Sequence, residues 1–180
     1  NPEQEYFSDG MTEDLITDLS KFSGLSVIAR NSVFTYKGKA INVPDVCREL
    51  GVRWALQGSV RKAGNRVRIT AQLIDGKTGG HLWADRFDRE LDDIFAVQDE
   101  VTGKIISALQ LKFSAAQERI SATRATMLPQ AYDLYLRARK MITKGSPAET
   151  RKAQRFIREA LDVDPNYSTA MAGLAMTYIA

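Results

Sequence analysis

Three stretches of the sequence contain side chains whose types and spacing could support chemistry. His81 and Asp85 have the types of a proton-transfer dyad and lie four residues apart. The run 71–78 (AQLIDGKT) matches a relaxed phosphate-binding loop, in which backbone amides and a helix N-terminus hold phosphate. Four arginines gather around one predicted turn, where they could hold an anionic headgroup, a nucleotide or an acidic partner: Arg53, Arg61, Arg66 and Arg68.

A structural explanation accounts better for each of these stretches. Two residues at positions i and i+4 of one strand lie about 13 Å apart, so His81 cannot share a proton with Asp85. The run 71–78 ends an alternating strand and leads through Gly79 and Gly80 into another strand, so no helix follows to bind phosphate. We therefore predict a solvated histidine and a hairpin turn. The arginines are typical of a solvated strand face, with anion binding as the alternative.

The residue counts exclude several classes of enzyme. The chain has 180 residues with one His and one Cys, which leaves no intrachain disulfide, no cysteine metal cluster and no site with two imidazoles. We predict no catalytic residue, no metal and no cofactor. No stretch approaches 18 uninterrupted apolar residues, so we predict no membrane span. The chain starts at Asn1 without an initiator Met, and we expect it to be a segment of a longer protein.

The first 113 residues alternate predicted helices and strands, which indicates an α/β module with a small mixed sheet and packed helices. Leu25–Ala29 is predicted to be a buried strand, and residues 30–39 a loop. The other expected elements are a helix around 11–22, a short helix at 46–50, strands at 52–62, 66–74 and 81–88, and a long helix from about 93. Trp54 and Trp83 are predicted to pack in the core, with a ligand pocket as the alternative.

The expected hairpin turn at Gly64 and Asn65 also predicts a strand register. It places Val60 opposite Ile69 and Arg61 opposite Arg68. Arg61, Arg66 and Arg68 would then share the solvent face of the sheet. These three arginines are candidate interaction residues.

The last 51 residues, 130–180, are helical throughout, after a segment at 114–129 that is typical of a helix end and linker. They resemble about one and a half tetratricopeptide repeats. Met171, Leu174, Ala175 and Tyr178 fit the first-helix pattern, and three second-helix positions also fit: Ala153, Ile157 and Ala160. Shifting Leu134, Ala138 and Met141 by 37 positions gives Met171, Ala175 and Tyr178.

So few repeats do not form an independent solenoid. We therefore expect Met171, Leu174 and Tyr178 to lack their next partner helix. Another chain or residues of the α/β module would cover them. These three residues complete the set of candidate interaction residues.

Motifs in order along the first part are familiar: NPEQEYFSDG at 1–10, VIARNS at 27–32, YKG at 36–38, QGSVR at 57–61, TAQL at 70–73 and LWAD at 82–85. Together they resemble the TolB amino-terminal-like domain that precedes tetratricopeptide repeats in many bacterial class III adenylate or guanylate cyclases. The family usually has a further strand just before the position of Asn1, so the resemblance implies that the sheet lacks its first strand or borrows one. Similar modules also follow DNA-binding and kinase domains.

The resemblance implies a non-catalytic regulatory or protein-interaction region. The helical repeat would bind a protein or peptide, and residues 1–113 would couple that event to an upstream cyclase domain. The alternative is a small-ligand sensor that uses the arginine face or the region of Trp54 and Trp83. We expect self-association and no nucleic-acid binding, because aromatic residues do not alternate with the arginines. Cytoplasmic, membrane-associated and periplasmic placements all stay open.

Overall fold

The computed structural model of the chain describes residues 5–22, 24–109, 128–143 and 145–179. Its elements are α1 (Glu5–Ser20), α2 (Arg30–Phe34), α3 (Val43–Leu50), β1 (Trp54–Ala63), β2 (Arg66–Asp75), β3 (His81–Glu90), a 3-10 turn (Leu91–Asp93), α4 (Ile94–Ala108), α6 (Pro129–Ile142), α7 (Pro147–Val163) and α8 (Ser168–Ile179). The fold is mixed α and β, as predicted. Most of the predicted linker, 114–127, lies outside the described residues.

The hairpin of β1 and β2 follows the predicted register. Val60 pairs with Ile69 and Arg61 pairs with Arg68 across the two antiparallel strands. Gly64 adopts a φ of 58° at the turn, a left-handed conformation that a glycine accepts at little cost. Strand β3 then pairs antiparallel with β2, with one irregularity between Leu73 and Ile74.

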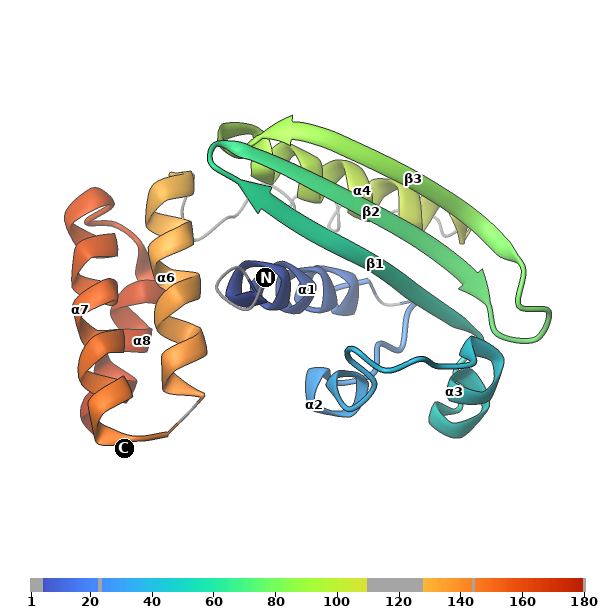
Figure 1. The fold of residues 1–180 in the computed structure, drawn as a ribbon, viewed down its shortest axis with the longest axis horizontal. Coiled ribbons are helices and arrows are strands. Elements are labelled where there is room, and N and C mark those ends of the chain that lie inside the picture. Colours follow the sequence, from blue (N-terminus) through green and yellow to red (C-terminus); the bar gives the residue numbers. More distant parts are fainter. Residues whose placement is uncertain (1–4, 23, 110–127, 144, 180) are drawn as a thin grey trace.

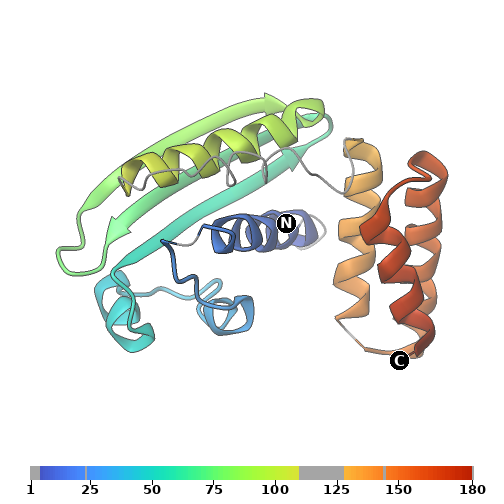
Figure 2. The same cartoon turned by 180° about the vertical axis from the view of Figure 1, so that it is seen from behind.

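Only one face of the sheet is covered by helices of the described chain. Helices α1 and α4 lie against that face, as both sides of the molecule show (Figures 1 and 2). Four alternate residues of β2 are buried there, namely Val67, Ile69, Ala71 and Leu73. The first three pack in one cluster with the apolar stripe of α4, which includes Val97, Val101 and Ile105. The opposite side chains of the strands face solvent.

Three expectations for the sheet and its surroundings are wrong. The sheet is antiparallel throughout the described residues, not mixed. Leu25–Ala29, expected as a buried strand, pairs with no strand among the described residues. Leu25 and Val27 nevertheless pack against the core, so the apolar pattern predicts their burial correctly and their strand pairing wrongly. Residues 30–34, expected as loop, form helix α2.

The carboxy-terminal helices α6, α7 and α8 lie side by side beyond the amino-terminal end of α1 (Figure 1). Their contacts are made largely by alanines that are fully buried, with Ile157 between them: Ala131, Ala138, Ala153, Ala160 and Ala170. Small side chains let helix backbones approach closely. Helix α7 begins at Ser146, whose side chain accepts the amide of Glu149.

Candidate interaction surfaces

Helix α8 has an outer face without charge. Its inner side is buried at Ala170, Gly173 and Thr177, where Gly173 lies against Tyr135 of α6 and Thr177 against Gln154 of α7. The outer positions are apolar and exposed: Met171, Ala172, Ala175, Met176 and Tyr178. Met176 is 69% exposed and Tyr178 is 64% exposed. A helix that is apolar on all sides is ordinarily buried, so this face is incomplete as it stands.

The structure places the predicted residues of α8 in two groups. Leu174 is half-buried and packs against the cluster formed by the helices. Met171, 48% exposed, and Tyr178 point away from that cluster. The described residues of the α/β module do not cover these two side chains. Cover by another chain stays a prediction.

Polar contacts hold α8 on α7 at one end. The Gln154 side-chain amide donates to the hydroxyl of Thr177 at 3.2 Å, and that hydroxyl donates to the Leu174 carbonyl at 2.6 Å. Arg158 donates to the hydroxyl of Tyr178. Tyr178 is therefore held in place with its ring still exposed, which preserves a fixed shape for the outer face.

A second feature, which we call the joint, connects α6 to the α/β module. Its centre is the buried carboxylate of Asp133 on α6. That carboxylate accepts the Tyr6 hydroxyl at 2.7 Å and lies 2.6 Å from the Lys62 ammonium of β1. Arg137, one turn later on α6, lies 2.9 Å from the other carboxylate oxygen. Burial and the neighbouring Asp133 raise the pKa of Tyr6 to about 12, so its hydroxyl stays protonated and donates.

The other half of the joint is built around Tyr132, which is 5% exposed. Its hydroxyl donates to the carboxylate of Asp14 on α1 and accepts the side-chain amide of Gln98 on α4 at 3.1 Å. Its ring lies edge-on to Phe95 at a centroid distance of 5.2 Å. Burial raises the pKa of Asp14, although the hydrogen bond from Tyr132 opposes the shift. One side chain of α6 thus contacts both helices that lie against the sheet, α1 and α4.

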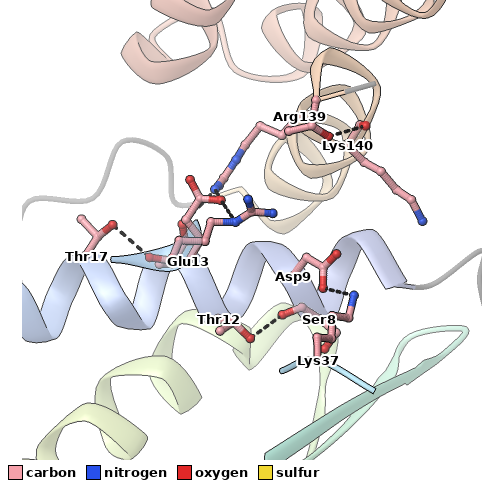
Figure 3. Close-up of polar contacts among 11 residues, drawn as sticks. Ser8, Asp9, Thr12, Glu13, Thr17, Lys37, Arg139 and Lys140 are labelled. Atoms are coloured by element: carbon pink, nitrogen blue, oxygen red, sulfur yellow. Dashed lines mark hydrogen bonds and ion pairs between the residues drawn. The ribbon is translucent and has the colours of Figure 1, made fainter. Parts of the chain in front are cut away.

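Ion pairs extend the joint along α1. Figure 3 shows Arg139 of α6 directed at Glu13, and Lys37 directed at Asp9. Glu13 also lies 3.0 Å from Arg30, so this one carboxylate contacts cations of α2 and of α6. The joint, defined by these polar residues, includes hydrogen bonds between segments more than 100 residues apart, from Tyr6 to Asp133 and from Tyr132 to Asp14. Sequence analysis did not identify it.

The open face of the sheet carries the predicted arginines. Arg61, Arg66 and Arg68 are exposed and share this face, as the register requires. Arg68 donates to Asp88 of β3 at 2.6 Å, and Arg86 lies 3.4 Å from the same carboxylate. The hydrogen bond from Arg68 holds the pKa of Asp88 below its usual value. The fourth predicted arginine, Arg53, is apart from this group, beside Trp54 and 3.6 Å from Asp75.

The two other chemical motifs form no site. Residues 75–80 make the predicted hairpin turn, in which the Asp75 carboxylate accepts the amides of Lys77 at 2.8 Å and Thr78 at 3.3 Å. His81 is exposed at the start of β3. Asp85 points to the helical side and lies 2.5 Å from Lys104 of α4. Trp83 packs against the core beside Phe87, as predicted.

The described part of the chain also has no cluster of metal ligands and no helix suited to a membrane. No three side chains of His, Cys, Asp or Glu come together there as metal ligands. No described helix combines the length and the apolar character needed to cross a bilayer.

Comparison with known proteins gives one informative similarity. No family model matches the chain. Over 176 residues it is 54% identical to a protein of Rhizobium meliloti (strain 1021) described as "Putative adenylate cyclase 3". The match covers 98% of this chain and 30% of that protein. The chain is therefore similar, along almost its whole length, to one part of a protein described as an adenylate cyclase.

Proposed function

We propose that this chain is a non-catalytic regulatory and protein-interaction region of an adenylate-cyclase-type signalling protein. It couples the binding of a protein partner to an upstream cyclase domain. The similarity to a longer protein described as an adenylate cyclase supports the type of parent. The uncharged outer face of α8 supports the role in binding and is the observation on which the proposal rests.

The partner contributes an apolar surface, most simply one face of a helix. Ala172 and Ala175 leave room for close approach, while Met171, Met176 and Tyr178 project on either side of them. Methionine side chains adapt to different partner shapes because they are long and unbranched. A second copy of the chain can supply the same surface, which would produce self-association.

Helix α6 transmits the binding event in this proposal. Ala131 and Ala138 belong to the cluster of the three carboxy-terminal helices, whereas Tyr132 and Leu136 belong to the core of the α/β module. The two sets lie on one rigid helix, so a displacement of α7 and α8 is carried into the module through the joint.

The proposed modules are a TolB amino-terminal-like module at 1–113, a helix end and linker at 114–129, and a partial tetratricopeptide region at 130–180. The ordered motifs of the first part favour the TolB amino-terminal-like module. The small residues at the helix contacts and the spacing of 37 residues favour the tetratricopeptide region. The first strand of the module is missing or borrowed in this proposal, which agrees with the unpaired state of Leu25–Ala29.

The Rhizobium meliloti relative offers a direct test. Its matching segment is deleted, or replaced by this chain, and the rate of cyclic AMP formation from ATP is measured in the full-length protein. We expect deletion to change the rate and replacement to restore it. If deletion and replacement both leave the rate of the relative unchanged, the proposed regulatory role is wrong.

Charged substitutions on α8 test the binding face. Met171→Glu with Met176→Glu places two carboxylates on the outer face, and the replacement should then fail to restore the rate. Ser168→Glu with Thr169→Glu adds the same charges at exposed polar positions of the same helix and should behave as the unmodified chain. Circular dichroism checks that both variants fold, since exposed substitutions change stability by about 0.5 kcal/mol or less. Equal behaviour of the two pairs would contradict a docking role for this face.

A further inference from the structure

The open face of the sheet has a positively charged end, which we call the arginine cluster: Arg61, Arg66, Arg68 and Arg86. Arg61 lies directly opposite Arg68, and Arg66 stands two residues from Arg68 on the same face. Arg86 lies opposite Thr70, the next outward position of β2 after Arg68. Neighbouring positions of this kind bring side chains within about 5–8 Å of one another.

The arginine cluster has more positive than negative charge. The same end of the face has two outward carboxylates, Asp88 and Glu90. Asp88 is shared by Arg68 and Arg86, and the described residues supply no ion pair for Arg61 or Arg66. Like charges placed directly across two strands destabilise a sheet. Folding therefore gains nothing from the pairing of Arg61 with Arg68, which points to a function for these side chains.

A polar groove of about 760 Å³ continues from the arginine cluster along the strands. Its floor includes a hydroxyl pair, Ser59 and Thr70 at 2.9 Å, and an amide pair, Gln57 and Gln72 at 3.2 Å. Arg86 lines it as well, and no aromatic residue does. A shallow open surface of this kind suits an elongated partner better than a small molecule, which ordinarily needs an enclosing pocket. The lack of aromatic platforms disfavours single-stranded nucleic acid.

We propose that the arginine cluster and this groove bind an extended acidic segment of a partner protein. Alternate side chains of an extended segment lie about 6.8 Å apart, which is also the spacing of Arg66 and Arg68 along β2. Guanidinium groups bind carboxylates through paired hydrogen bonds. The hydroxyl and amide pairs of the groove form hydrogen bonds with the polar side chains that come next along the bound segment. This site lies on different elements from α8 and does not depend on the proposed function.

The test uses the 180-residue chain and a fluorescein-labelled peptide that alternates glutamate and threonine, followed by fluorescence anisotropy. We expect binding that weakens with added salt, and no binding of a peptide that alternates glutamine and threonine. Arg61→Gln with Arg68→Gln should weaken binding about tenfold or more. Arg151→Gln with Arg155→Gln removes the same charge from the exposed face of α7 and should leave binding unchanged.

Several outcomes would overturn the proposal. The first is that the acidic peptide does not bind, and the second is that both double arginine variants lose the same amount of affinity for it. The third is that a single-stranded oligonucleotide, vesicles with anionic lipid or inorganic phosphate bind more tightly than the peptide. Thermal unfolding of Arg61→Gln provides a second measurement. Because Arg61 faces a like charge, its removal should leave the melting temperature equal or higher, and a fall of several degrees would assign Arg61 to the fold instead.

Discussion

The joint and the outer face of α8 are two contact surfaces of opposite construction. In the joint, polar side chains of α6 meet partners on α1, α4 and β1, and Asp133 alone contacts Tyr6 of α1, Lys62 of β1 and Arg137 of α6 itself. On α8, the apolar side chains of the outer face are covered by no described helix and are exposed by up to 69%. Both surfaces belong to the same group of three helices.

This difference separates a completed interface from an incomplete one. Buried polar groups are tolerated where each has a hydrogen-bond partner, and the joint meets that condition within one chain. An exposed apolar face gains free energy only when another surface covers it. The helical region is thus fixed to the module on one side and has an exposed apolar face on the other.

The largest effect on this contrast is expected from Leu136→Ala. Leu136 is 1% exposed and inserts from α6 beside Gly10, where an added methyl group would come within 2.4 Å of it. Its truncation should lower the free energy of unfolding by about 2–5 kcal/mol. Chemical denaturation measures the loss. Met176→Ala on the outer face is the control and should change stability by about 0.5 kcal/mol or less; equal losses would remove the distinction between the surfaces.

A smaller effect is expected from Asp133→Asn. The substitution removes the charge that Lys62 and Arg137 face and should cost about 2 kcal/mol of unfolding free energy. Tyr6→Phe removes one hydrogen bond and should cost about 1 kcal/mol. A double-mutant cycle measures their coupling. If the two losses simply add, Tyr6 and Asp133 do not act together and the joint is weaker than described.

The smallest effect is a pH dependence of opposite sign at Asp14 and Asp75. Asp14 has a raised pKa in the folded state, so the folded chain binds its proton first as the pH falls. Relative to Asp14→Asn, the natural chain should therefore gain stability as the pH falls through the raised pKa towards the ordinary value near 3.8.

Asp75 should behave in the opposite way. Backbone hydrogen bonds, first from Lys77, lower its pKa, so its contribution is present above about 3.8 and is lost as the pH falls below it. Relative to Asp75→Asn, the natural chain should lose stability in that lower range. Melting temperatures of the three proteins between pH 7 and pH 3 decide the matter. If the melting temperatures of the three proteins change with pH in parallel, neither carboxylate has the shifted pKa that its contacts in the folded state imply.

The hairpin shows how much local pattern can specify. Alternation in β2 and a turn at Gly64 and Asn65 suffice for the register, because a shift by one residue would turn every apolar side chain to water. The shared face of Arg61, Arg66 and Arg68 follows from that register alone. The small residues at the contacts of α7 and α8 are likewise visible in the helical spacing.

The joint shows where local pattern stops. Tyr132, Asp133 and Asp14 carry no signal of pairing, since each is an ordinary residue of an amphipathic helix. Asp133 and Tyr132 are more than 100 residues from Tyr6 and Asp14, and these two pairs exist only because α6 packs across the end of α1 (Figure 1).

Sequence by itself determined most of the elements, the strand register and the solvent face of the arginines, because each depends on neighbours along the chain or on the period of the apolar residues. Tertiary structure decided which polar groups have hydrogen-bond partners and which apolar faces are covered. It left Leu25–Ala29 unpaired, placed Asp133 among three partners and left the outer face of α8 exposed. Those outcomes depend on which distant segments pack together. That packing determines whether a buried polar group has a hydrogen-bond partner and whether an apolar group is removed from water, and so it determines the free energy of each.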